Sequence, residues 1–132
     1  MGGPTINRLA GSFRDPSGFI FKDNGVIYRQ VNLSSREQYD KLMSSGLYSS
    51  LIKDGLMVSH ETTDQWGEEV DGVYKIIKPE MIPFISYPYE WCFSELKDAA
   101  LLTLEIQMRA LKYGLTLKDS SPFNVQFFNG KP

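Results

Sequence analysis

Short runs of β-branched and aromatic residues along the chain predict several β-strands. The clearest two lie at residues 19–22 and 26–31, with Asp23-Asn24-Gly25 between them. Asn-Gly readily adopts the positive φ angles of a type I′ turn, so the two runs are expected to form a β-hairpin. Further short runs predict strands at 56–58, 73–78, 84–87 and 125–128.

Apolar residues at alternating spacings of three and four predict two helical regions. Residues 34–55 start at a serine cap, are interrupted by Gly46 and end at Gly55, while residues 94–113, capped by Ser94, carry the stronger pattern. So wide an apolar arc on this second helix indicates that it packs on more than one side. Its two apolar rows are Leu101, Leu104, Met108, Leu111 and Leu115, and Leu102, Ile106 and Ala110.

These elements together indicate an α+β fold with a small antiparallel sheet and one long helix. Residues 1–17, rich in Gly, Pro and Ser, are expected to form a flexible N-terminal segment, and residues 18–132 a single domain. Six acidic and no basic residues between 54 and 71 indicate a solvated loop. Because a second turn signal, Asn129-Gly130, is followed by only two residues, we expect a longer parent protein.

Composition and charge narrow the classes of function. A formal net charge of −2 gives no basic surface for nucleic acid, and no apolar run is long enough to cross a membrane. With one cysteine, Cys92, and one histidine, His60, the chain can form neither an intrachain disulfide nor a Cys/His zinc cluster. A cytoplasmic location is therefore expected. Because Cys92 is flanked by Trp91 and Phe93, we also expect its side chain to be buried.

One polar segment after the long helix could carry chemistry. Asp119 and Asn124 lie five residues apart, between that helix and a predicted strand. Kinase-like phosphotransferases place Asp-x₄-Asn in this setting, where Asp receives the hydroxyl proton of the substrate and Asn binds magnesium. The alternative is a polar turn in which Asp119 or Ser120 caps the main chain.

The order of elements around this segment resembles part of a kinase-like fold, with aminoglycoside phosphotransferases as the nearest comparison. That resemblance implies that Tyr89, Glu90 and Trp91 form the segment that receives the adenine of ATP. However, the chain contains no Gly-x-Gly, so the glycine-rich loops that bind ATP phosphates or S-adenosylmethionine are absent. ATP and magnesium would bind only if residues beyond Pro132 completed the site.

A second resemblance covers most of the chain. Residues 28–32, 45–48, 83–91, 96–105 and 124–127 resemble the N-terminal region of a bacterial family. Its members are usually labelled S-adenosylmethionine-dependent methyltransferases, and some carry a nodulation-related name. The resemblance implies that a downstream Rossmann-like domain, absent from this chain, binds S-adenosylmethionine and is the partner of this region.

Three hypotheses for function follow. The leading one is a non-catalytic accessory domain that positions a substrate or partner for the downstream methyltransferase domain, with no cofactor of its own. The second is part of a phosphotransferase site in which Asp119 is the base and Asn124 the magnesium ligand. The third is a dimerisation module in which an exposed strand edge pairs with a second copy to form a homodimer.

Overall fold

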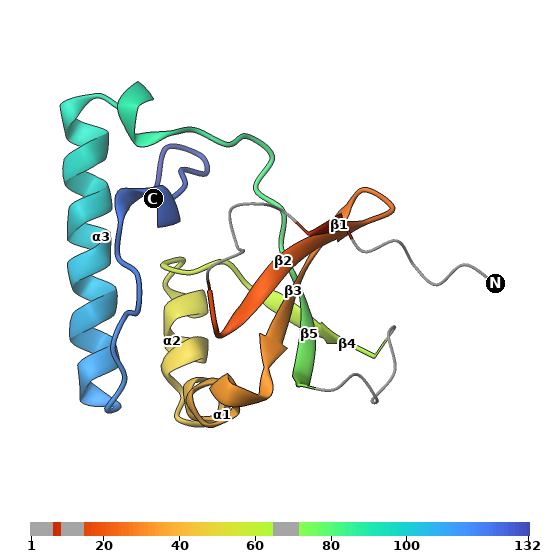
Figure 1. Ribbon diagram of the computed structural model, residues 1–132. Coiled ribbons are helices and arrows are strands. Elements are labelled where there is room, and N and C mark those ends of the chain that lie inside the picture. Colours follow the sequence, from red (N-terminus) through yellow and green to blue (C-terminus); the bar gives the residue numbers. More distant parts are fainter. Residues whose placement is uncertain (1–6, 9–14, 65–71) are drawn as a thin grey trace. The chain divides into compact units, whose positions relative to one another are not determined.

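The computed structural model describes residues 7–8, 15–64 and 72–132 (Figure 1). It divides the chain into two compact units, described separately below. The first contains residues 1–41 and 58–81, and the second contains residues 42–57 and 82–132. Most of the predicted flexible segment, and part of the predicted acidic loop, lie outside the described residues.

The first unit is built on an antiparallel sheet with strand order β1-β2-β3-β5-β4. The predicted hairpin is confirmed, because β2 and β3 pair across a turn in which Asn24 and Gly25 have φ angles of 48° and 84°. Figure 1 shows β3 at the centre of this sheet. The strands are β1 (Asn7–Arg8), β2 (Gly18–Asp23), β3 (Val26–Asn32), β4 (His60–Thr63) and β5 (Val73–Pro79).

Two strands of this sheet, β1 and β4, were not predicted, and the strand predicted at residues 56–58 is wrong. Residues 56–58 form no strand, whereas β4 lies inside the region expected to be a solvated loop. β4 is an edge strand that pairs only with β5. Its two middle residues, Glu61 and Thr62, are exposed to solvent, which is common in edge strands. The strand was missed because its sequence, His-Glu-Thr-Thr, is polar. Its two threonines nevertheless favour β structure.

The core of the first unit is aromatic. Phe21 of β2 and Tyr28 of β3 lie opposite each other in the hairpin and stack with ring centroids 5.5 Å apart. Ile76 of β5 completes the buried cluster. The core therefore joins three neighbouring strands on one face of the sheet.

The helices follow the predicted pattern closely. After a 3₁₀ turn at Leu33–Ser35, α1 (Arg36–Ser44) and α2 (Leu47–Lys53) are separated at Gly46, which has a φ angle of 93°. The long helix, α3 (Phe93–Lys112), begins one residue before the predicted cap. Cys92 is its N-cap residue and is exposed, so the prediction that Cys92 is buried is wrong. Together with the sheet, these helices confirm the α+β class.

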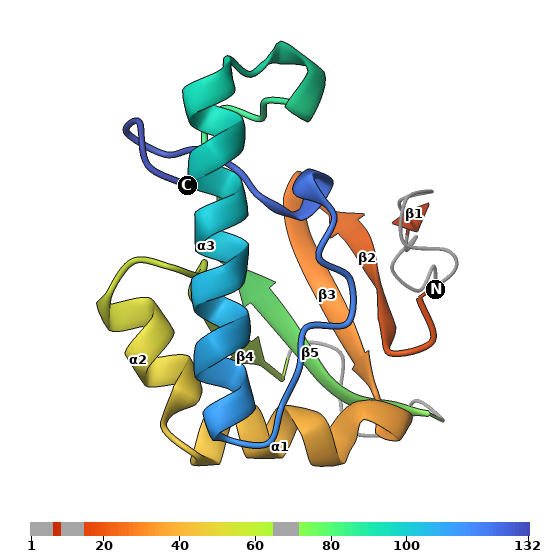
Figure 2. The same ribbon diagram turned by 90° about the vertical axis from the view of Figure 1, so that its left-hand side faces the viewer.

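The second unit has its core between α2 and α3, which lie side by side in Figure 2. Leu47 and Leu51 of α2 pack against Ala110 of α3. Behind this contact, the guanidinium of Arg109 donates hydrogen bonds to Asp54 (2.6 Å) and to Glu105 (2.7 Å). Of the predicted second row of α3, Ala110 is buried in this core and Ile106 packs against it.

The strands predicted at 84–87 and 125–128 are wrong. Tyr87 and Val125 have extended backbone angles, but neither segment joins a ladder of the sheet. Pro83 and Pro88 flank the first and have no N–H to donate. Near the C-terminal end, Phe128 and Lys131 form a single bridge around the predicted Asn129-Gly130 turn, whose φ angles are 52° and 74°.

A close approach in the hairpin gives a test of the sheet. A Cβ atom at Gly18 would lie 1.8 Å from the carbonyl oxygen of Gln30, whereas one at Gly25 would meet nothing within 4 Å. We expect Gly18→Ala to lower the free energy of unfolding by about 2 kcal/mol or more, because the β2–β3 pairing must open. Gly25→Ala should cost only about 1 kcal/mol, from its positive φ angle.

Urea denaturation followed by far-ultraviolet circular dichroism compares the two variants. A Gly18→Ala protein as stable as Gly25→Ala would contradict the observed register.

Candidate functional site

The second unit carries several exposed aromatic residues in one stretch of chain, here called the aromatic segment (residues 84–93). Phe84, Tyr89 and Phe93 have 76%, 77% and 80% of their surface exposed. The rings of Tyr87 and Tyr89 stack in parallel, with centroids 5.5 Å apart. Large apolar side chains that are exposed together mark a surface suited to binding.

A single side-chain amide holds the first half of this segment. Gln126 Oε1 accepts a hydrogen bond from the Ser86 main-chain N–H (3.0 Å), and Gln126 Nε2 donates one to the Ser86 carbonyl (3.1 Å). The side-chain amide of Gln126 thus makes the two hydrogen bonds that the main chain of a neighbouring strand would make with Ser86. These two bonds hold the main chain at Ser86 although the segment joins no strand of the sheet.

Trp91 and Glu90 hold the second half. The indole N–H of Trp91 donates to Ser86 Oγ at 2.9 Å, and its ring lies edge-on to Phe127 with centroids 5.0 Å apart. Glu90 Oε2 accepts the main-chain N–H of Tyr87 at 2.8 Å, capping the 3₁₀ turn Pro88–Glu90. Polar contacts therefore fix the main chain beneath the exposed rings.

The structure brings the three predicted adenine-binding residues into this segment and gives each a different environment. Tyr89 is exposed, the Glu90 carboxylate binds the main chain, and Trp91 is half-buried against Phe127. Their role in binding a cofactor stays a prediction.

Asp119 and Asn124 lie together in one exposed turn. Asp119 Oδ1 accepts the main-chain N–H of Ser121 at 3.0 Å, and Asn124 Nδ2 donates to the Asp119 carbonyl at 3.3 Å. Asp119 therefore caps this turn. Across the described residues, no three His, Cys, Asp or Glu side chains are grouped to hold a metal ion. The roles of Asp119 as a base and Asn124 as a magnesium ligand stay predictions.

Sequence reasoning missed Gln126 and Ser86, whose contact organises the segment. A signal was present, because Gln126 is the one polar residue in the run 125–128. An amide in such a run can bind the main chain of a neighbouring segment that lacks a strand partner.

The first unit contains a cluster of aromatic and titratable side chains. The hydroxyl of Tyr39 on α1 lies 2.9 Å from Nε2 of His60 on β4. Nearby, Tyr74 donates to Asp40, and the ammonium of Lys75 lies over the Tyr39 ring. Partial burial lowers the pKa of His60 below its ordinary value of 6.5.

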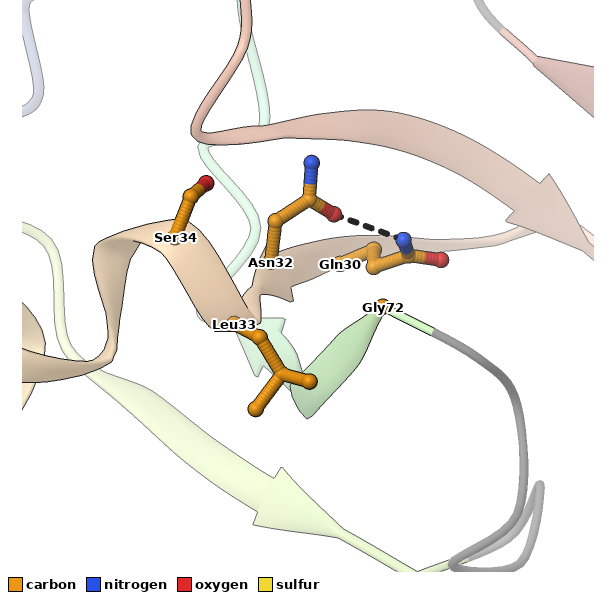
Figure 3. A pocket seen from close by; sticks show the side chains of 5 residues that line it. All are labelled: Gln30, Asn32, Leu33, Ser34 and Gly72. Carbon is orange, nitrogen blue, oxygen red and sulfur yellow. Dashed lines mark hydrogen bonds between the residues drawn. The ribbon is translucent and has the colours of Figure 1, made fainter.

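A small open pocket also lies in the first unit, lined by residues of β3, the 3₁₀ turn that follows it and Gly72 (Figure 3). Its volume is about 340 Å³. Gln30 Nε2 donates to Asn32 Oδ1 at 2.7 Å, and Asn32 Nδ2 donates to the Pro16 carbonyl at 3.0 Å. These amides are therefore engaged in holding the strand end together.

Comparison with curated proteins identifies a relative that matches almost the whole length of this chain. The sequence is 30% identical over 131 residues to nodulation protein NoeA of Rhizobium meliloti (strain 1021), a match that covers 98% of this chain. The chain spans only 27% of the length of NoeA. The nodulation-related resemblance is thus confirmed, whereas the methyltransferase label stays a prediction.

No family model matches the chain. No solved structure matches it either, so the kinase-like resemblance stays a prediction. Among the described helices, none is long and apolar enough to cross a membrane.

The contact between Gln126 and Ser86 predicts a local effect of substitution. Gln126→Ala removes both hydrogen bonds and should speed exchange of the Ser86 amide about tenfold, equivalent to about 1.4 kcal/mol. Hydrogen exchange followed by NMR measures this directly. Gln38→Ala, an exposed substitution on α1, is the control and should leave Ser86 unchanged. Equal exchange in both variants would show that the amide does not hold the segment.

The lowered pKa of His60 predicts how stability depends on pH. Because the folded protein disfavours the charged imidazole, the unfolded chain takes up a proton more readily. Stability should therefore be constant above pH 6.5 and fall as the pH decreases below it. His60→Phe should abolish this fall, whereas Tyr39→Phe should retain it, as measured by urea midpoints between about pH 5 and 8. A fall that persists in His60→Phe would assign it to other groups.

Proposed function

We propose that this chain is a non-catalytic accessory domain of a longer nodulation-related protein. In that protein it positions a substrate or partner for a downstream S-adenosylmethionine-dependent methyltransferase domain. The observation that carries this proposal is the aromatic segment, a set of exposed rings on a main chain fixed by Gln126, Glu90 and Trp91.

The physical argument is pre-organisation. A segment already held in one conformation loses little conformational entropy on binding, so more of its contact energy contributes to affinity. Aromatic side chains are also enriched among the residues that dominate binding energy at interfaces. Phe84 and Tyr89 therefore combine a large apolar surface with a rigid support.

The length of NoeA supports an occupant within the same polypeptide. Since the match covers 27% of NoeA, most of that protein lies outside the region that resembles this chain. A domain joined covalently to its partner binds at a high effective concentration. A modest apolar surface such as the aromatic segment is then sufficient for docking.

A chimera of NoeA in which this chain replaces the matched segment tests the docking. We expect amide exchange in residues 84–93 to be slower in the chimera than in the isolated chain. Phe84→Ser/Tyr89→Ser should remove that protection, whereas Met81→Ser, an exposed apolar control outside the segment, should keep it. Equal exchange in the chimera and the isolated chain would contradict the proposal.

Ligand addition tests the non-catalytic part of the proposal in the same experiment series. A ligand that binds only the folded state raises the melting temperature. Neither S-adenosylmethionine nor ATP with magnesium should shift the melting temperature of this chain. A clear rise with S-adenosylmethionine would overturn the accessory role, and a rise with ATP and magnesium would favour the phosphotransferase alternative.

A further inference from the structure

We propose that two copies of this chain associate through α3, packed against each other in antiparallel orientation. The contact is made by four residues on one side of this helix, here called the α3 seam. They are Leu101, Leu104, Met108 and Leu111. This surface is distinct from the aromatic segment and does not depend on the proposed function.

The α3 seam is exposed although it consists of large apolar side chains. Its members have 54–60% of their surface exposed. The residues of α3 that are buried are Ala99 and Ala110, which are small. Within its own unit, α3 is the front helix in Figure 2, with its outer side turned to the viewer. The unit thus buries Ala99 and Ala110 and packs Ile106 against its core, but it leaves the four large residues of the seam exposed.

The spacing of the seam is that of a coiled coil. Intervals of three, four and three residues correspond to positions a and d of a heptad, which two helices bury between them. The seam is also symmetric about Ile106. In an antiparallel pair centred there, Leu101 lies opposite the partner's Leu111, and Leu104 lies opposite the partner's Met108.

Charge complementarity identifies a second copy as the occupant and sets its direction. Asp98 and Lys112 lie near opposite ends of α3, both at position e beside the seam, and neither forms an ion pair within the described part of the chain. An antiparallel pair places Asp98 of each copy beside Lys112 of the other copy, which gives one opposite-charge contact at each end of the pair. The helix dipoles also oppose each other in this arrangement, which is favourable.

The remaining charged residue at position e does not oppose this pairing. Glu105 lies near the centre of the pair, where it would approach the partner's Glu105. Its carboxylate is already bound to Arg109 in the same chain at 2.7 Å, which offsets its negative charge. In a parallel pair, Asp98 would instead face position g, where Ala100 and Gln107 carry no charge.

The interface is small, so association should be reversible. Four large residues from each copy bury less than the roughly 1,200 Å² at the lower end of standard interfaces. Complexes of this size are typically weak, and a dissociation constant in the micromolar range is expected.

Sedimentation equilibrium of the chain, from micromolar to millimolar concentration, tests the dimer. The unaltered chain should show a monomer–dimer equilibrium, and Leu104→Ser/Met108→Ser should be monomeric throughout. Leu96→Ser, on α3 but outside the seam, is the matched control and should dimerise as the unaltered chain does. A monomeric unaltered chain would overturn the proposal, even if the remainder of NoeA bound the seam.

Charge reversal tests the orientation. Asp98→Lys places like charges together at both ends of an antiparallel pair and should weaken association about tenfold. Asp98→Lys/Lys112→Asp exchanges the charges and should restore it. Failure of the double variant to recover, with Asp98→Lys weakened, would exclude the antiparallel arrangement.

Discussion

The packing of α2 on α3 is the constraint on which the second unit depends. Leu47 and Leu51 bury themselves against Ala110, whose methyl group allows the two helices to approach closely. α2 covers the side of α3 that carries Ala110 and Ile106, and Leu101, Leu104, Met108 and Leu111 on another side of the helix stay exposed. The exposed seam is therefore a consequence of how the core of this unit is built.

The aromatic segment follows the same principle with different chemistry. Its main chain is held by the amide of Gln126 and the carboxylate of Glu90, and the side chains of Phe84, Tyr89 and Phe93 are exposed. Polar groups in both regions act as supports, since Arg109 likewise fastens α3 to the end of α2. The second unit thus presents two separate apolar surfaces, each backed by fixed polar contacts, an arrangement suited to association.

Local chemistry explains which elements could be predicted from the sequence. The β2–β3 hairpin and the break at Gly46 depend on residues next to each other in the chain, so the Asn-Gly turn and the glycine were sufficient. Residues 84–87 have the composition of a strand, but their partner is the side chain of Gln126, forty residues away. No short-range pattern reveals such a partner. β4 was missed for a related reason, because its pairing with β5 outweighs its polar sequence.

The candidate site shows the same limit. The spacing of Asp119 and Asn124 was visible, but the sequence did not show the hydrogen bonds to Ser121 and to the Asp119 carbonyl that cap the turn. The wide apolar arc of α3 was likewise evident, but the structure covers one side of it, so the prediction of packing on more than one side stays a prediction. Which apolar row of α3 is covered depends on where α2 packs, and the contacting residues of α2 and α3 lie far apart in the sequence.

The most direct test of this account measures the distance between the two copies of Cys92, the only cysteine of the chain and the exposed N-cap of α3. Cys92 lies fourteen residues before the centre of the seam at Ile106. At 1.5 Å per residue, an antiparallel pair separates spin labels on the two cysteines by about 40 Å along the helices. Double electron–electron resonance should therefore give a distribution centred near that distance. A separation of about 10 Å, the spacing of helices packed in parallel, or no intermolecular coupling at millimolar concentration would contradict the account.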